Sequence, residues 1–413
     1  MTIVEKILAR ASGKEKVAIN EIVMAKVDVA MSHENADVVL RSFRDIGVKK
    51  VWDPRRIVIL FDHRIPADSE KTAQTHKRLR EFVREQGIEH FYDLKEGICH
   101  QVLAELGHDR PGEVLVGTDS HTTTHGAFGT FATGIGGTEM SGVWATGELW
   151  LKVPESIKIT VHGSFKKYVS AKDLILHIIG TLGADGADYC SVEFHGETIG
   201  SMSIASRMVL SNLSMEMGAK VAFVLPDDKT VQYVRQRSDK KFEVVLPDAD
   251  AAYVQTLEVD AGELSSQVAC PHTVDNVKPI KDIAGLKIDQ ALIGSCTNGR
   301  LEDLAIAAEI IGDKKVHNEV RLLVIPASRR VYLEALAKGY IETFVKAGGL
   351  VLNPGCGPCL GAHQGLLAPG EVCIATTNRN FKGRMGSPEA SVYLASPATV
   401  ACSALEGEVV EPC

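Results

Sequence analysis

The sequence predicts an α/β protein whose sheets are mostly parallel. Two patterns support this fold class: short apolar runs typical of buried parallel strands recur along the chain, and helical spacing of apolar residues lies between many of them. The apolar runs are Ile57–Phe61, Val114–Val116, Ile157–Val161, Val221–Leu225, Ala291–Ile293, Leu322–Ile325 and Val372–Ala375. The helical patterns include Thr72–Gln86, Ala171–Ile179, Leu301–Ile311 and Arg330–Ala337.

The length of the chain indicates more than one domain. A chain of 413 residues exceeds what one hydrophobic core usually organises. Composition shifts near Pro154 and between Pro279 and Gly285 suggest boundaries. We therefore expect three α/β domains, at residues 1–154, 155–282 and 283–413.

Composition and charge exclude several classes of protein. Hydrophobic residues make up 45% and charged residues 24% of the chain, and no apolar run is long enough to span a bilayer. The net charge of -8 disfavours binding to a phosphate backbone, so neither nucleic acid nor a membrane is an expected partner. The first residues lack a secretory signal, and nine cysteines suit thiols in a reducing compartment. We expect a cytoplasmic enzyme.

Polar side chains follow directly after several of the predicted strands. Asp62 and His63 follow the first run, Thr118-Asp119-Ser120-His121 follows the second, and Ser295-Cys296-Thr297-Asn298 follows the fifth. Ligands in α/β folds bind in the crevice beyond the carboxyl ends of the strands. We expect these side chains to converge on one site.

Three cysteines are candidate ligands of a metal or a cluster. Cys356-Gly357-Pro358-Cys359 places two sulfurs within reach of one metal, although a redox pair or half of a zinc site has the same spacing. Cys296, on a turn between a strand and a helix, is a third candidate. Three thiolates on a four-iron cluster would leave one iron free to act as a Lewis acid. The remaining cysteines are expected to be buried or incidental thiols: Cys99, Cys190, Cys270, Cys373, Cys402 and Cys413.

Carboxylate–imidazole pairs and an arginine-rich segment complete the candidate chemistry. Asp62-His63 and Asp119-Ser120-His121 place imidazoles beside carboxylates, where the partners set tautomer and pKa, although each pair alone is also compatible with a structural role. His100 and Glu216 are ambiguous from the sequence alone. Asn378-Arg379-Asn380-Phe381-Lys382-Gly383-Arg384 follows a predicted strand and offers guanidinium groups for carboxylates, with a charged surface loop as the alternative. The glycine-rich residues 126–137 match no nucleotide-binding fingerprint and predict tight backbone packing.

In combination and order, four of these motifs resemble the aconitase superfamily. They are Asp119-Ser120-His121, Ser295-Cys296-Thr297-Asn298, Cys356-Gly357-Pro358-Cys359 and Asn378-Arg379-Asn380-Phe381-Lys382-Gly383-Arg384. The resemblance covers essentially the whole chain and implies three aconitase-type domains around a central cluster cleft. Length and ending look like the large subunit of the two-subunit branch, which includes 3-isopropylmalate dehydratase, homoaconitase and 2,3-dimethylmalate dehydratase.

The resemblance also implies a cofactor and roles for individual residues. It implies one [4Fe-4S] cluster on Cys296, Cys356 and Cys359, with the fourth iron binding a small hydroxy-diacid substrate. Asp62 and His63 match the pair that protonates the leaving hydroxyl. The positions that match other site residues of the family are His100 with Asp119 and His121 with Glu216 around the bound water, Ser120 and Asn212 beside them, and Arg379, Arg384 and Asn378 at the substrate carboxylates.

Two departures from the family pattern bear on subunits and substrate. Single-chain aconitases supply the base that removes the carbon-bound proton from a further domain, so here the base is expected on a separate small subunit. In Ser32-His33-Glu34-Asn35-Ala36, His33 and Glu34 fit the motif of the isopropylmalate and homoaconitate enzymes, with His33 in a substrate-binding position, whereas Asn35 and Ala36 do not. The implied activity is a hydro-lyase of leucine biosynthesis acting on isopropylmalate, with dimethylmalate and homoaconitate enzymes as alternatives. An iron-sensing RNA-binding protein and a zinc-stabilised module are the alternatives from other classes.

Overall fold

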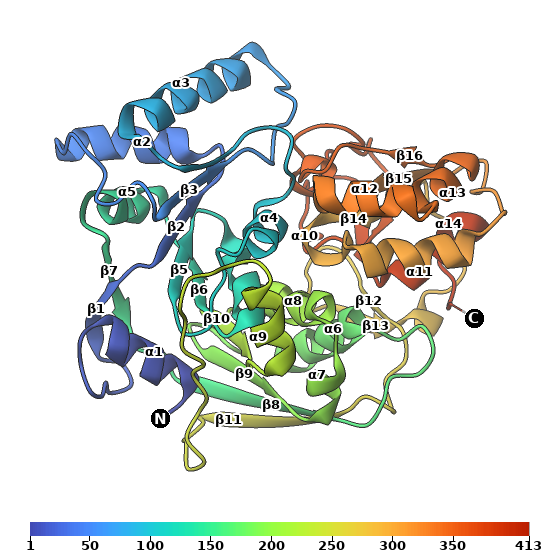
Figure 1. The fold of residues 1–413 in the computed structure, drawn as a ribbon. Coiled ribbons are helices and arrows are strands. Elements are labelled where there is room, and N and C mark those ends of the chain that lie inside the picture. The colour runs from blue at the N-terminus through green and yellow to red at the C-terminus, as the bar shows by residue number, and fades with distance from the viewer. Residues whose placement is uncertain (413) are drawn as a thin grey trace.

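The structure is a computed structural model that describes residues 1–412, so the expectation for Cys413 lies outside the described residues. Three main sheets carry the fold, and the first is formed by the N-terminal part of the chain (Figure 1). Its order is β4-β3-β2-β5-β6, all parallel, with β2 at Val29–Ser32, β3 at Ile57–Leu60, β4 at His90–Tyr92, β5 at Val114–Gly117 and β6 at Phe131–Gly134. The associated helices are α1 (Ile3–Ala11), α2 (Ala36–Ile46), α3 (Glu70–Gln86), α4 (Cys99–Glu105), the 3₁₀ segment η1 (Ser120–Phe128) and α5 (Gly137–Thr146). An antiparallel ribbon of β1 (Ile22–Lys26) and β7 (Glu148–Lys152) leads to the next sheet.

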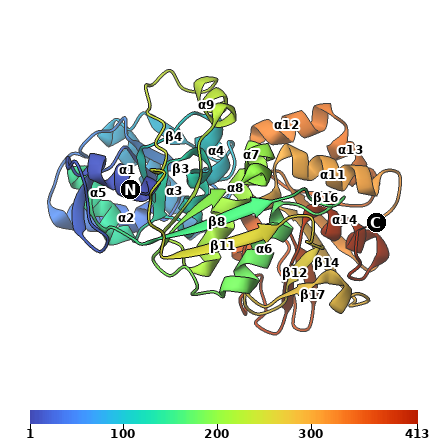
Figure 2. The same ribbon diagram turned by 90° about the horizontal axis from the view of Figure 1, so that it is seen from below.

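The second sheet lies between the two ends of the molecule (Figure 2). Its order is β10-β9-β8-β11, all parallel, with β8 at Ser156–His162, β9 at Ser191–His195, β10 at Val221–Val224 and β11 at Gln255–Asp260. The associated helices are α6 (Ala171–Leu182), α7 (Glu197–Ser201), α8 (Ile204–Leu213), η2 (Ser214–Met217) and α9 (Asp228–Arg235). The first turn of α6 shows why the helix begins there: Asp173 accepts a hydrogen bond from the Ser170 backbone N–H at 2.9 Å, and Ser170 Oγ accepts from the Lys172 N–H at 3.3 Å.

The third sheet is mixed and contains seven strands in the order β13-β12-β18-β17-β14-β15-β16. They are β12 (Gln267–Ala269), β13 (Val277–Pro279), β14 (Gln290–Gly294), β15 (Arg321–Ile325), β16 (Leu350–Val351), β17 (Val372–Ala375) and β18 (Ser391–Leu394). The helices are η3 (Ile280–Asp282), α10 (Ser295–Asn298), α11 (Leu301–Ile311), α12 (Arg329–Ala337), α13 (Tyr340–Lys346), η4 (Gly357–Leu360) and α14 (Pro397–Glu406). Only the contacts of β12 with β13 and β18 are antiparallel within this sheet.

The predicted fold class is confirmed. Each of the seven apolar runs forms a strand, and each of the four helical patterns forms a helix. The three domain ranges stay a prediction, and the strands bear on one of the limits: β12 and β13 precede residue 282, yet β12 pairs with β18 of the third sheet. Among residues 1–412, no helix combines the length and the apolar character needed to cross a bilayer.

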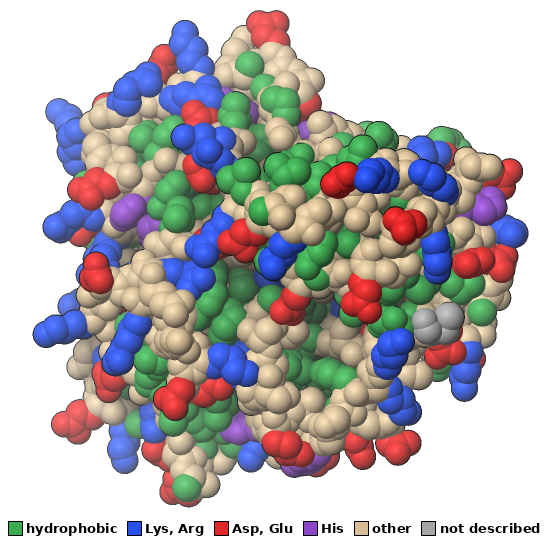
Figure 3. Space-filling model, turned by 45° about the vertical axis from the view of Figure 1, so that its right-hand side comes forward, with side chains coloured by type: hydrophobic (Ala, Val, Ile, Leu, Met, Phe, Trp, Pro, Cys, Tyr) green, Lys and Arg blue, Asp and Glu red, His purple; other side chains and the backbone are tan. Residues whose placement is uncertain are grey.

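Strand β10 is buried on both faces and joins two hydrophobic cores. Its side chains alternate in direction, as in any strand. Val221 and Phe223 pack into the core beneath the first sheet, whereas Ala222 and Val224 pack into the core that the second and third sheets share. The relative placement of the three sheets therefore depends on apolar packing. The face drawn in Figure 3 shows basic and acidic side chains interspersed over the surface.

The close approach of η1 to β10 depends on one glycine, in the glycine-rich segment whose tight packing the sequence predicted. A Cβ added at Gly126 would lie 1.9 Å from the carbonyl oxygen of Ala222. We predict that Gly126→Ala lowers the free energy of unfolding by more than about 2 kcal/mol, because the backbones must separate. Urea unfolding measures this loss.

Gly142 is the matched control, because it lies inside α5 and a Cβ added there meets nothing within 4 Å. Gly142→Ala should leave the protein as stable or raise the free energy of unfolding by about 0.5–1 kcal/mol. Equal effects of the two substitutions would contradict the packing argument.

Candidate active site

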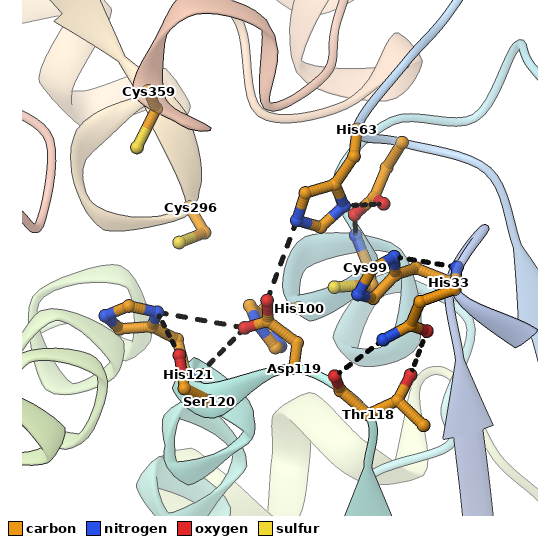
Figure 4. A network of polar contacts seen from close by, with 12 residues as sticks. His33, His63, Cys99, His100, Thr118, Asp119, Ser120, His121, Cys296 and Cys359 are labelled. Carbon is orange, nitrogen blue, oxygen red and sulfur yellow. Dashed lines mark hydrogen bonds and ion pairs between the residues drawn. The ribbon is translucent and has the colours of Figure 1, made fainter. Parts of the chain in front are cut away.

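The polar residues beyond the strand ends lie together between the first and third sheets. Figure 4 shows the sulfur atoms of Cys296 and Cys359 on one side and His63 and Asp119 on the other. Backbone hydrogen bonds join the two sides: the Cys356 N–H donates to the Asp62 carbonyl at 2.7 Å, and the Ile98 N–H donates to the Ala327 carbonyl at 2.9 Å. The residues that end separate strands in the sequence thus share one space.

His63 lies between two carboxylates. Its Nδ1 is 2.5 Å from Asp62 Oδ1, and its Nε2 is 3.6 Å from Asp119 Oδ2. Burial disfavours the imidazolium, but the charge of Asp62, the proximity of Cys356 and the contacts with both carboxylates outweigh burial and raise the pKa of His63 well above its usual value. The second oxygen of Asp62 accepts the Cys99 backbone N–H at 2.8 Å, which fixes the carboxylate plane. At neutral pH, His63 therefore holds a proton that faces the site.

Asp119 collects hydrogen bonds from several directions. His100 Nε2 lies 2.8 Å from Asp119 Oδ1, and the same oxygen accepts the His121 backbone N–H at 2.8 Å. Burial alone would raise the pKa of Asp119, but the bonds from His100, His121 and His63 lower it well below its usual value. Asp119 is thus ionised, and His100 Nε2 must carry a proton toward it.

A second network runs from η1 to the arginine-rich segment. His121 Nε2 lies 2.8 Å from Glu216 Oε1, and Arg379 Nε donates to the same oxygen at 2.8 Å. Burial would raise the pKa of Glu216, but its bonds to His121 and Arg379 lower it. Ser120 Oγ lies 3.4 Å from His121 Nδ1. Because Glu216 lies on η2, this network ties residues of all three main sheets together.

The three predicted cysteine ligands are buried thiols, each between 3% and 9% exposed. Asn212 and Asn378 each donate from Nδ2 to Cys296 Sγ at 3.3 Å, and Cys359 Sγ lies 3.5 Å from Asn378 Oδ1. Burial and the proximity of the other thiols raise the pKa of Cys296, and burial raises that of Cys356 to about 12. Such thiols become thiolates only when a cation takes the place of their protons.

The spacing of the sulfurs distinguishes a cluster from a single ion. Thiolates on one tetrahedral zinc ion lie about 3.8 Å apart, since each Zn–S bond is about 2.3 Å. In the described part of the chain, the one group whose ligand atoms all lie within 4.8 Å of one another is His33, Glu34, Asp62 and His63; the cysteine trio does not meet that distance. Because the three sulfurs do not all lie within 4.8 Å of one another, the trio suits several metal ions, as in an iron–sulfur cluster, better than a single ion.

Two predicted residues lie at the edge of these networks. The His33 ring stacks on His63 with the ring centroids 4.1 Å apart. Arg384 is not joined by a hydrogen bond to the other predicted residues, and its buried Nε has no partner within the described structure. A guanidinium with an unused donor is available to an anion.

Sequence reasoning did not assign a role to Glu34, which positions the Asp62–His63 pair. Its Oε1 accepts the backbone N–H groups of Asp62 at 3.1 Å, His63 at 2.9 Å and Arg64 at 2.9 Å. Burial would raise the pKa of Glu34, but the bonds from His33, the charge of His63 and the backbone donors lower it far below its usual range. The His33-Glu34 pair in the sequence was the available signal.

A buried arginine and a buried lysine hold the backbone of the site, and sequence reasoning missed both. Arg300 donates to the Cys296 carbonyl at 2.7 Å and to the Thr297 carbonyl at 2.6 Å. Lys172 Nζ donates to the carbonyls of Thr376 at 3.0 Å and Thr377 at 2.6 Å, directly before Asn378. No local pattern marks a lysine whose partners are about two hundred residues away along the chain.

Fold and site together define an α/β enzyme in which buried thiols face carboxylate–imidazole pairs. The model of the aconitase family (aconitate hydratase) matches residues 5–285 and 276–407, so the chain belongs to the aconitase family. The chain is 58% identical over 413 residues to a protein of Methanothermobacter thermautotrophicus named probable 3-isopropylmalate dehydratase large subunit, covering 100% of this chain and 99% of that protein.

Two further relatives carry names that differ in substrate. A 3-isopropylmalate dehydratase large subunit 1 of Methanopyrus kandleri is 54% identical over 412 residues, covering 100% of this chain and 98% of the relative. A probable methanogen homoaconitase large subunit of Methanothermobacter thermautotrophicus is 55% identical over 417 residues, covering 100% of this chain and 97% of the relative. Membership of the aconitase family implies an iron–sulfur cluster, and the buried, widely spaced thiols fit that group.

The role of Glu34 as a positioning residue gives a prediction for stability. Glu34→Gln should lower the free energy of unfolding by about 2 kcal/mol at pH 7, because backbone donors lose a charged acceptor. The folded pKa of Glu34 lies below the unfolded value of about 4.3, so its contribution is fully present above that pH and is lost as the pH falls. The difference between the variant and the wild type should therefore shrink below about pH 4 in urea unfolding.

Glu81→Gln, at an exposed position of α3, is the control and should change stability by less than about 0.5 kcal/mol at either pH. A Glu34→Gln difference that is constant from pH 7 to pH 3 would show that the ionised carboxylate is not the group that matters.

Proposed function

We propose that this chain is the large, cluster-bearing subunit of a hydro-lyase that interconverts 2-isopropylmalate and 3-isopropylmalate by dehydration and rehydration in leucine biosynthesis. The observation that carries the proposal is the convergence of three buried thiols on the His63–Asp119 network: Figure 4 shows Cys296 and Cys359 facing it, and Cys356 lies beside His63 and Cys359. Relatives at 58% and 54% identity named 3-isopropylmalate dehydratase large subunit support the same activity.

The proposed cofactor is one [4Fe-4S] cluster held by Cys296, Cys356 and Cys359. When bound, it supplies a Lewis acid for the substrate hydroxyl and carboxylate, because three protein thiolates leave one iron open. The amide groups of Asn212 and Asn378 donate to Cys296 Sγ, and such donors stabilise the thiolate form. Arg300 and Lys172 hold the backbone from which Cys296 and Asn378 project.

His63 is the proposed acid for the departing hydroxyl. Its Nδ1 is directed at Asp62, which leaves the Nε2 proton directed into the site. A pKa well above the usual value keeps that proton in place at neutral pH, and Glu34 fixes the backbone that carries the ring. His100 with Asp119 and His121 with Glu216 are proposed to orient the water that forms, with Ser120 adjacent.

Arg379 and Arg384 are the proposed carboxylate ligands. Arg379 is fixed by Glu216, whereas the buried Nε of Arg384 lacks a partner among the described residues and is free for a diacid. Guanidinium groups remain charged at any working pH and bind carboxylates bidentately. Asn378 lies beside them in the sequence and the His33 ring stacks on His63, which supports a proposed role for both in binding the same substrate.

A separate small subunit is the proposed partner. It supplies the base that removes the carbon-bound proton, and the words "large subunit" in the names of the relatives support such a partner. We propose that the assembled enzyme works in the cytoplasm, where a reducing environment keeps cysteines as thiols.

A homoaconitase activity is the second candidate, because relatives with that name are 55% and 53% identical to this chain, against 58% and 54% for two named isopropylmalate enzymes. The dimethylmalate alternative rested on Asn35 and Ala36. Asn35 Nδ2 donates to the Thr118 carbonyl at 3.1 Å, and Asn35 Oδ1 accepts from Thr118 Oγ1 at 2.6 Å. The Asn35 side chain is thus used to join α2 to the end of β5, which weakens its value as a marker of substrate.

Replacement of Cys356 tests the cluster. Cys356→Ser should abolish bound iron, acid-labile sulfide and turnover together, because one ligand of the cluster is lost. Elemental analysis and anaerobic assay with the small subunit measure these quantities. Cys190→Ser, at a half-buried thiol outside the site, should retain all three.

Full activity of Cys356→Ser would exclude the proposed cluster. Zinc in place of iron and sulfide in the wild-type chain would favour a zinc-stabilised module, and specific RNA binding that survives moderate salt, without turnover, would favour an iron sensor.

A substrate panel tests the choice of acid. The anaerobic, iron-reconstituted chain with its small subunit is assayed with isopropylmalate, dimethylmalate, homocitrate and citrate, and ultraviolet absorbance of the unsaturated acid measures turnover. We expect the highest kcat/KM with isopropylmalate. Alkyl differences of this size discriminate by about 10- to 200-fold. A preference for homocitrate would establish the homoaconitase alternative instead.

A further inference from the structure

Two buried groups behind the site have no part in the proposed mechanism, yet they continue its hydrogen-bond network. His125 Nε2 lies 3.3 Å from His100 Nδ1, and His125 Nδ1 lies 2.8 Å from Asp109 Oδ2. Together with the 2.8 Å contact of His100 Nε2 and Asp119 Oδ1, these distances define an unbranched series of hydrogen-bonded side chains, Asp119–His100–His125–Asp109, called the chain below. His100, His125 and Asp109 are each at most 2% exposed.

The number of hydrogen bonds in this chain fixes the number of protons. Each of the three contacts needs one proton between its two atoms, whereas two neutral imidazoles between two carboxylates carry only two. With two protons, one contact would bring two lone pairs together. The chain therefore holds one proton beyond the neutral imidazoles, either as an imidazolium or as the acid form of Asp109, and the net charge of the four groups is then −1.

The surroundings of Asp109 favour storage of this proton. Asp109 Oδ1 is buried and has no hydrogen-bond partner within the described structure. The neighbouring Arg110 directs its guanidinium to Glu113 and to the Gly107 carbonyl, so it does not neutralise Asp109. A buried carboxylate with one partner needs a compensating proton or cation. The other titratable groups beside this chain are His108 near His125, Tyr233 near Asp109, and His121 near His100 at the opposite end. Burial lowers the pKa of His100, which favours the neutral form of that ring.

Neither His108 nor Tyr233 replaces His125 as the source of the compensating charge. Burial, with the positive groups around it, lowers the pKa of His108 to about 3, so that ring is neutral. Burial raises the pKa of Tyr233 to about 12, so its hydroxyl stays protonated and uncharged. His121 is bonded to Glu216 on the other side of Asp119. His125, bonded to Asp109 and in contact with His100, is thus the ring through which the third proton of the chain reaches Asp109.

We propose that His125 and Asp109 are positioning residues that form a proton store behind the active site. When His100 Nε2 gives its proton to Asp119, His100 Nδ1 takes the proton from His125 Nε2, and His125 keeps its bond to Asp109 through Nδ1–H. The four groups keep their total of three protons until Asp119 passes one on, and its second oxygen lies 3.6 Å from His63 Nε2. The store thereby fixes the tautomer of His100 and links it to His63. The kinetic part of this inference rests on the proposed function, whereas the proton count does not.

Nitrogen-15 NMR of the full-length chain labelled at histidine tests the store directly. At about pH 8, where ordinary histidines with a pKa near 6.5 are neutral, the wild-type chain should show an imidazole pair with three N–H protons on its four nitrogens, or the same count with Asp109 as the acid. If the wild-type pair holds three N–H protons, Asp109→Asn should reduce it to one proton per ring. If Asp109 holds the third proton, each ring carries one proton and the side-chain carboxyl signal of Asp109 in carbon-13 NMR should be that of the acid form. The resonances are assigned by their loss in His125→Asn. Two neutral rings with one proton each and an ionised Asp109 in the wild type would overturn the proposal.

Kinetics provide the second readout. Asp109→Asn should lower kcat by about 10- to 100-fold with KM within about twofold, and should move the acid limb of the kcat profile, as expected for loss of a partner behind a reacting group. Glu197→Gln removes a carboxylate from the exposed His162–Glu197 pair and should leave both parameters unchanged. Normal kcat and an unmoved pH profile in Asp109→Asn would overturn the role in turnover. If the NMR proton count holds while no malate derivative is turned over, the proposed function fails and the proton store stands.

Discussion

The carboxylate of Asp119, whose side chain is 18% exposed, is the constraint around which the site is arranged. A carboxylate that is largely removed from water is stable as an anion only when donors surround it. Here the donors come from η1 through the His121 backbone, from α4 through His100, and from the loop after β3 through His63. Each donor ring is in turn held by another acid: Asp62 for His63, Glu216 for His121 and, through His125, Asp109 for His100. Charge balance therefore dictates the alternation of acids and imidazoles over the whole site.

Bringing these acids and imidazoles together requires three sheets to be held in place, and apolar packing between the sheets provides the stability for this. The groups come from separate sheets, and they meet only when the sheets are held together. Strand β10 provides that connection, because Val221 and Phe223 enter one core while Ala222 and Val224 enter another. The contact of Gly126 with Ala222 then brings η1, which carries His121 and His125, directly against this strand. The electrostatics of the site are thus a consequence of where β10 places its neighbours.

The local sequence pattern was sufficient to predict the helices and strands named above and many residues of the site. It did not reveal contacts between residues far apart in the sequence. Apolar runs predicted all seven strands named from the sequence, because a parallel strand buried on both faces has an apolar signature whatever its partners are. Sheet membership was less accessible: the three-residue strands β12 and β13 are too short to carry a pattern, so their pairing in the third sheet was not predicted. Motif residues that adjoin strand ends were found, since position and residue type coincide there. Lys172 and Asp109 were not, because a buried ionisable side chain is recognised by its partners, and those of Lys172 are 204 and 205 residues away.

The division of residues among the sheets also explains why assembly and chemistry are inseparable in this fold. The first sheet provides the proposed acid and the imidazoles, and the third provides the thiols and the arginines. Glu216 of the second sheet bonds to both sides, to His121 and to Arg379. Asn212, also from the second sheet, donates to Cys296 and to Thr124 of η1. A shift of one sheet by an ångström would break hydrogen bonds on both sides of these two residues at once. Because buried charges without partners are costly, the same contacts that define the site oppose any such shift. The polar network therefore contributes to the register between the sheets as well as to the chemistry.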